Sequence, residues 1–97
     1  MQTTQAIGAI KPIMKYNVNW RPSAEAGLAR LWVAGVARKR MAAAQARIDK
    51  LLADNPLLHG PPVSEGLYAL HIPPLYVQYE IDEPKRRVWV VSLSYMP

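Results

Sequence analysis

The sequence lacks the residues from which several common kinds of site are built. Its 97 residues include no cysteine and only two histidines. Without cysteine there are no disulfide bonds and no thiolate metal ligands, and two histidines are too few to hold a structural zinc ion. No apolar run approaches the ~18 residues of a membrane-spanning helix, and the N-terminus has no long apolar region of the signal-peptide kind. We therefore expect a cytoplasmic protein with no metal or other cofactor and no membrane partner.

The sequence also contains none of the common short catalytic motifs. A GxGxxG loop, a phosphate-binding loop, an HExxH helix and a nucleophile elbow are all absent from the chain. These motifs are the usual signatures of nucleotide binding, zinc hydrolysis and acyl transfer. Two classes of function remain, which are catalysis without a metal and binding without catalysis.

Acidic residues are few and unevenly distributed. The chain has 12 Lys or Arg against 7 Asp or Glu, which gives a net charge of +5. Residues 11–50 hold nine of the basic residues and two acidic ones, whereas residues 51–97 hold three basic and five acidic residues. A basic front half suggests an anionic partner such as RNA, DNA or an acidic protein segment. The alternative is a charged surface that only keeps the protein soluble.

The length suits one small domain preceded by a short tail. Residues 1–14 show no sustained apolar period, so we expect a flexible N-terminal tail followed by a single domain over residues 15–97. Met14 directly precedes a clean strand pattern. We therefore hypothesise that Met14, rather than Met1, is the natural start of translation.

The apolar pattern predicts the order strand, helix, helix, strand, strand, strand. The first strand covers residues 16–20, and the first helix runs from Ser23, its expected N-cap, to Gly35. The second helix covers residues 37–54 and ends at Asn55-Pro56, and a loop follows over residues 57–62. The last three strands are expected over 68–72, 75–81 and 88–95.

These elements predict an α+β domain. Short turns between the last three strands favour an antiparallel sheet of about four strands, with the helical hairpin packed on one face. In the last strand we expect Trp89, Val91 and Leu93 on one face and Ser92 and Ser94 on the other.

The stretch over residues 64–81, SEGLYALHIPPLYVQYEI, indicates a strand, a two-proline turn and a second strand. Its alternation gives one apolar face that includes Tyr79. The other face collects the polar side chains with the richest chemistry in the chain, which are His71, Tyr76, Gln78 and Glu80. This face is either a functional site or a solvated surface.

The second helix carries a basic ridge next to its apolar stripe. At about 100° per residue, the stripe contains Met41, Ala44, Ile48, Leu51 and Leu52. The basic ridge, a name used below for these four residues, consists of Lys39, Arg40, Arg47 and Lys50. Small alanines between the charges would let a phosphate backbone approach closely. The alternative is a solvated helix face.

Three strings in this order resemble the RelE/ParE superfamily of toxins from bacterial type II toxin–antitoxin systems. They are YNVNWRPSAEAGLARL, ARIDKLLADNPLLHG, and the strand pair LYALHIPPLYVQYEID and RRVWVVSL. The resemblance covers residues 15–95, and its specificity lies in the order of the strings. It implies a small toxin that is neutralised by a cognate antitoxin. Some members cut mRNA on the ribosome, and others inhibit DNA gyrase.

The nuclease branch suggests roles for several residues by resemblance. His71 matches a strand histidine of one nuclease subgroup, and Tyr76 lies near that subgroup's turn aromatic. The expected catalytic residues are His71 for the proton, Arg87 for the scissile phosphate and Tyr95 to orient a base. The expected nucleic-acid contacts are the basic ridge and Arg86, with Tyr76 and Gln78 as supporting residues.

The sequence departs from the nuclease pattern at two places. Ile72-Pro73-Pro74 stands where many nucleases carry an arginine, and the chain ends at Tyr95-Met96-Pro97, without the usual C-terminal Arg or His. The leading expectation is an endoribonuclease that acts on mRNA at the ribosome. The alternatives are an inhibitor of DNA gyrase, which does not cut RNA, and an inactive binding protein with the toxin fold.

Overall fold

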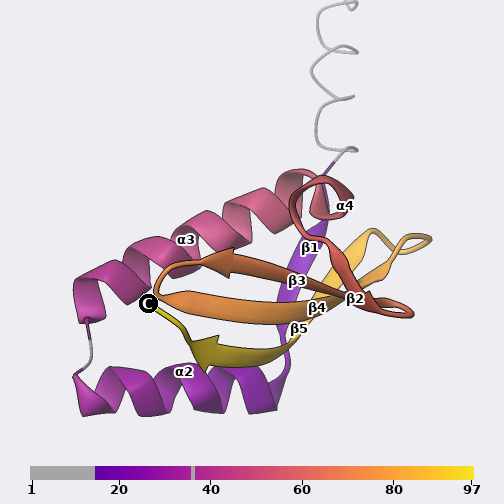
Figure 1. The fold of residues 1–97 in the computed structure, drawn as a ribbon. Helices are drawn as coiled ribbons and strands as arrows, with labels where there is room; N and C mark the ends of the chain where they lie inside the picture. The colour runs from indigo at the N-terminus through magenta and orange to yellow at the C-terminus, as the bar shows by residue number, and fades with distance from the viewer. Residues whose placement is uncertain (1–14, 36) are drawn as a thin grey trace, which may run out of the picture.

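The computed structural model describes residues 15–35 and 37–97. The predicted tail over residues 1–14 and the hypothetical start at Met14 lie outside the described residues. The elements are β1 (Asn17–Trp20), α2 (Pro22–Ala34), α3 (Arg38–Asp54), α4 (Pro56–His59), β2 (Pro62–Ser64), β3 (Leu67–Ile72), β4 (Leu75–Asp82) and β5 (Arg87–Tyr95). Figure 1 shows one sheet, with α3 running across it and α2 lying beside β5.

The sheet has the strand order β1-β5-β4-β3-β2, so the predicted α+β class is confirmed. It differs from the expected sheet in two ways. β1 pairs with β5 in parallel, whereas all other pairs are antiparallel. β2 is a fifth strand, which the sequence did not indicate because its three exposed residues, beginning with Pro62, are too few to show an alternation.

The N-cap of α2 lies two residues earlier than expected. Pro22 occupies the first turn, Arg21 is the N-cap without a side-chain hydrogen bond, and the hydroxyl of Ser23 donates instead to the Val91 carbonyl. The fixed φ of proline suits the first helical position, so Pro22 starts the helix and the Ser23 cap is wrong. The C-terminal end of α2 is as predicted, because Gly35 adopts φ 76° and donates its N–H to the carbonyl of Trp32.

The core lies between α3 and the sheet. The predicted stripe of α3 is confirmed, since Met41, Ala44, Ile48 and Leu52 are buried. They pack with buried residues of β3, β4 and β5, which include Leu70, Leu75, Val77, Tyr79, Val88 and Val90. The alternation in β4 is confirmed as well, since its residues at 75, 77 and 79 are buried and those at 76, 78 and 80 are not.

The segment after α3 is more ordered than the predicted loop. It contains the short helix α4, and Tyr79 donates its hydroxyl to the Pro56 carbonyl at 2.6 Å. Gly60 packs so closely on this tyrosine that an added Cβ would collide with the Tyr79 hydroxyl and the Ala69 carbonyl. The sequence therefore needs a glycine here for a close approach.

A β-bulge in β5 changes which of its residues face the core. Gln78 pairs with Ser92 but Tyr79 pairs with Val90, so Val91 is an extra residue on β5. An extra residue reverses the alternation on its two sides. The expectation that Trp89, Val91 and Leu93 share a face is therefore wrong. Trp89 pairs with Glu80 and lies on the open face, away from the helices.

Within the part of the chain that the structure describes, no helix is both long and apolar enough to cross a membrane.

Candidate functional site

The open face of the sheet gathers the predicted polar cluster at one end. His71 pairs with Tyr76, and Tyr76 pairs with Ser94 on the neighbouring strand. Gln78 pairs with Ser92, and the Ser92 hydroxyl donates to Oε1 of Gln78 at 3.1 Å. The structure therefore brings His71, Tyr76 and Gln78 onto one face.

His71 is exposed and is held by the C-terminal segment. Its Nε2 lies 2.6 Å from the main-chain oxygen of Met96, and the Met96 N–H donates to the Pro74 carbonyl at 2.7 Å. The edge of its ring meets the Tyr76 ring, with 6.2 Å between centroids. A carbonyl only accepts hydrogen bonds, so Nε2 carries the proton in this contact. In a neutral imidazole, Nδ1 is then the nitrogen that can accept a proton.

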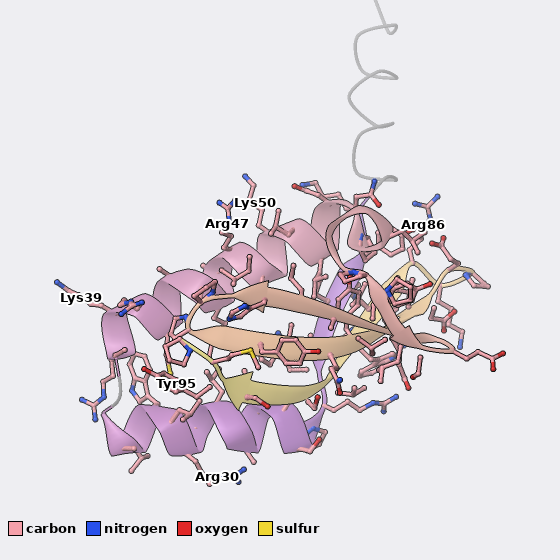
Figure 2. All side chains as sticks on the ribbon, viewed as in Figure 1. Arg30, Lys39, Arg47, Lys50, Arg86 and Tyr95 are labelled. Atoms are coloured by element: carbon pink, nitrogen blue, oxygen red, sulfur yellow. The ribbon has the colours of Figure 1, made fainter. Side chains whose placement is uncertain are left out.

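Tyr95 lies at the same end of the sheet but on the other face. It pairs with Leu75, which is fully buried on the side of the helices. Figure 2 shows its ring near the level of α2, at the end of the molecule where Lys39 extends from α3. The structure thus places Tyr95 close to the His71 end without aligning the two side chains on one face.

Arg86 and Arg87 lie at the opposite end of the β4–β5 hairpin. Arg87 pairs with Asp82, eight residues along β5 from Tyr95, a separation of roughly 25 Å. Figure 2 shows Arg86 on the far side of the molecule from Lys39 and Tyr95. The structure does not bring Arg87 together with His71 and Tyr95.

These two arginines belong to a group of cations and aromatic rings that the sequence did not predict. The guanidinium of Arg87 lies 5.7 Å from the centroid of Trp89, and that of Arg21 lies 4.3 Å from the same ring. Nε of Arg87 is shielded from solvent and has no hydrogen-bond partner among the described residues. The alternation along β5 puts Arg87 and Trp89 on one face. Arg21 comes from a distant segment, so no local pattern links it to them.

Tyr16 extends this group toward the β4–β5 turn. The guanidinium of Arg86 lies 5.3 Å from the Tyr16 ring, and the Tyr16 hydroxyl donates to Glu83 at 2.8 Å. This hydrogen bond to a carboxylate, more than any other influence, raises the pKa of Tyr16.

The basic ridge is exposed along α3. All four of its residues are exposed, and Figure 2 shows Arg47 and Lys50 pointing away from the sheet. The ridge therefore places positive charge at two points along the side of α3 that does not pack on the core, with uncharged residues 41–46 between them.

A second feature that the sequence did not predict is a carboxylate in a cleft between α2 and α3. Nε1 of Trp20 donates to Oδ1 of Asp49 at 2.9 Å. Desolvation by burial raises the pKa of Asp49, and the hydrogen bond from Trp20 partly opposes this effect. Trp20 and Asp49 are 29 residues apart, so no local pattern could have linked them.

No group of three or more His, Asp or Glu side chains comes together as a metal site within residues 15–35 and 37–97. The open face offers the imidazole of His71, the phenol of Tyr76 and the hydroxyl groups of Ser92 and Ser94. The basic ridge and the pair Arg86 and Arg87 offer contacts to an anion.

No family model and no curated protein matches the sequence. Solved structures do match its fold. A chain of the toxin–antitoxin complex RelBE2 from Mycobacterium tuberculosis has a TM-score of 0.72 at 19% identity, covering 84% of this chain and 92% of that chain. A chain of the archaeal RelE–RelB complex from Pyrococcus horikoshii OT3 has a TM-score of 0.63 at 12% identity, covering 86% of this chain and 97% of that chain.

These matches define the class of fold. They cover most of this chain and nearly all of each matched chain. The protein therefore has the RelE-like toxin fold, and the fold that the sequence resemblance implied is confirmed.

Proposed function

We propose that this protein is the toxin of a type II toxin–antitoxin module and that a cognate antitoxin neutralises it. The observation that carries the proposal is the match of its fold, over more than four fifths of the chain, to chains from two toxin–antitoxin complexes. Both of those structures contain the toxin with its protein partner. A small basic protein with this fold fits the same kind of partnership.

We further propose that the toxin inhibits translation by cutting mRNA on the ribosome. The exposed basic ridge supports this activity, because lysines and arginines on one helix face bind a phosphate backbone. His71 is the general base: Nε2 is fixed by Met96, and Nδ1 takes the proton of the 2′-hydroxyl as its oxygen attacks the adjacent phosphorus. The bond from phosphorus to the 5′-oxygen of the next nucleotide breaks, and water protonates that leaving oxygen. Tyr95 would stack on a neighbouring base from the end of β5.

The position of Arg87 changes its role in this proposal. It lies at the far end of β5 from Tyr95, so it cannot share one phosphate with His71. We assign Arg86 and Arg87 to the RNA backbone at a distance from the cut. Lys39 extends at the same end of the molecule as Tyr95, and we assign it to a phosphate at that end.

A second candidate is a toxin without nuclease activity that inhibits DNA gyrase. One observation favours it: the three residues that the resemblance made catalytic do not converge, since His71 and Tyr95 lie on opposite faces and Arg87 lies at the other end. In this case the same fold would act by binding alone.

Induction of the protein in a bacterial host tests both candidates. Pulse labelling after induction should show protein synthesis stopping first for the nuclease, and DNA synthesis stopping first for the gyrase inhibitor. The His71→Ala variant should lose growth inhibition only in the first case. Ser94→Ala, from the same face, is the matched control and should remain toxic. An induced protein that does not affect growth contradicts the toxin role itself.

A further inference from the structure

A large cleft separates the two long helices. α2 and α3 diverge from their connection, as Figure 1 shows, and leave a cleft of ≈ 810 Å³ whose lining includes residues of both helices and of β1. Its apolar wall includes Trp20, Leu28, Trp32 and Val33. This volume is typical of a ligand-binding pocket, and it offers room for several side chains of a partner.

The helix on one side of the cleft is apolar around most of its circumference. Of its 13 residues, only Glu25 and Arg30 are charged, yet only Ala24 and Gly27 are buried. Trp32 is 45% exposed and Val33 is 79% exposed. A helix that is apolar on all sides is normally covered on all sides. The exposed part of α2 therefore fits a surface that a partner covers.

The charges inside the cleft are opposite to those of the whole protein. Glu25 and Asp49 are among its lining residues, whereas the lining includes no lysine or arginine in the described part of the chain. The protein as a whole carries a charge of +5. The cleft is thus an apolar surface with carboxylates in a basic protein, and it favours a partner segment that carries positive charge.

Asp49 makes this preference specific. A carboxylate has about four acceptor positions, and the indole of Trp20 fills one of them. While the cleft is open, water can reach the others. A purely apolar segment docked in the cleft would remove that water and leave a buried charge without a partner, which is costly. A lysine or arginine on the docked segment would instead donate to the carboxylate.

We propose that the cleft between α2 and α3 docks an amphipathic helix of a partner protein, and that Asp49 selects a helix with one lysine or arginine among its apolar positions. The occupant is helical because α2, with 13 residues, offers a wall about 20 Å long. A helix laid along such a wall inserts apolar residues at positions i, i+3, i+4 and i+7. This inference rests on the proposed function, since it describes the segment by which a protein antitoxin would hold the toxin.

A displayed library of amphipathic helices tests the proposal. The library has random residues along one face and is selected for binding to the immobilised full chain, and separately to its Asp49→Asn variant. Selection on the wild-type chain should enrich helices with a single Lys or Arg among apolar residues. Selection on Asp49→Asn should enrich helices without it.

One selected helix then gives the quantitative result. Replacing its basic residue by norleucine should weaken binding about tenfold on the wild-type chain, and much less on Asp49→Asn, because the two changes remove the same ion pair. Val33→Glu, at an exposed position of the wall, should weaken binding as well. Glu65→Gln removes an exposed carboxylate on the β2–β3 turn and is the matched control. Circular dichroism and thermal melting check that each variant is folded.

The outcomes separate this inference from the proposed function. The docking inference is overturned if the helices selected on the wild-type chain carry no basic residue. It is also overturned if Val33→Glu leaves binding unchanged, or if no helix is enriched at all. Growth inhibition is measured independently for the wild-type and Asp49→Asn proteins. If both inhibit growth while no helix binds, the toxin role stands and the docking site fails. If helices bind as expected but neither protein inhibits growth, the docking site stands and the toxin role fails.

Discussion

Nε2 of His71 lies 2.6 Å from the main-chain oxygen of Met96. This contact ties the last residues of the chain to the end of β3, and a second hydrogen bond, from the Met96 N–H to the Pro74 carbonyl, keeps the Met96 carbonyl in place. The imidazole is therefore oriented on the open face by main-chain atoms, which a substitution of the Met96 side chain would not remove.

His71→Ala should lower mRNA cleavage by about 10²-fold to 10⁴-fold, because general base catalysis contributes that much to rate. Purified protein is added to a translation reaction, and cleavage is followed by primer extension on the mRNA. The protein should remain folded, since His71 is exposed and its side chain is not part of the core. Unchanged cleavage by His71→Ala would remove the histidine from the mechanism.

Neutralising the basic ridge should weaken RNA binding and reduce its dependence on salt. Each phosphate contact that is lost should lower the slope of log K against log salt by about 0.7 to 1. Lys39→Ala, Arg47→Ala and Lys50→Ala are compared singly and together by titration with single-stranded RNA at several salt concentrations.

Arg30→Ala is the matched control for the ridge. It removes one positive charge from exposed α2, on a different helix from the ridge. Its slope should stay close to that of the wild-type protein. If the triple variant of the ridge and the wild-type protein have the same slope, the ridge is a solvated face and does not bind RNA.

The fold could be predicted from the sequence wherever a periodic pattern was long enough. The stripe of α3 and the alternation of β4 each repeat several times, so they identified the buried side chains of both elements. The pattern failed in β5, because one bulged residue, Val91, reverses the alternation and moves Trp89 to the open face. It also failed for β2, whose three residues contain no repeat.

The candidate site was less predictable than the fold. The alternation placed His71, Tyr76 and Gln78 on one face, because neighbouring strands of a hairpin have a fixed register. The strand predicted over residues 88–95 already implied that Arg87 and Tyr95 lie at its opposite ends. The pairing of β4 with β5 is what shows that the Tyr95 end is the one beside His71. Contacts such as Trp20 with Asp49 depend on tertiary packing and have no local signal.

Gly60→Ala should destabilise the protein by about 3 kcal/mol, at the upper end of the usual cost of overpacking. The new methyl group would meet the Tyr79 hydroxyl and the Ala69 carbonyl, and a main-chain atom cannot easily move away. Urea denaturation measures the change. Gly66→Ala is the control: it meets no atom within 4 Å, and its φ of 76° should cost only about 1 kcal/mol. Equal losses for both variants would contradict the close approach at Gly60.

Tyr79 should make the protein less stable at alkaline pH. Burial raises the pKa of Tyr79 from 10.0 to about 12. Between these values the unfolded chain loses the phenolic proton while the folded protein retains it, so rising pH favours unfolding. The stabilising contribution of the protonated phenol is complete below pH 10 and is lost as the pH rises toward 12. A pKa difference of two units between the folded and unfolded states corresponds to about 3 kcal/mol in the free energy of unfolding.

Comparison of Tyr79→Phe with the wild-type protein isolates this effect. At pH 8 the variant should be less stable by about 1–2 kcal/mol, because the Pro56 carbonyl loses its buried donor. Above pH 10 the gap between the two proteins should narrow, since phenylalanine has no proton to lose. Free energies of unfolding from urea titrations between pH 8 and pH 11 measure both quantities.

Tyr95→Phe, at a more exposed position, should follow the wild-type curve. A constant gap between Tyr79→Phe and the wild-type protein across this range would contradict a buried, protonated Tyr79.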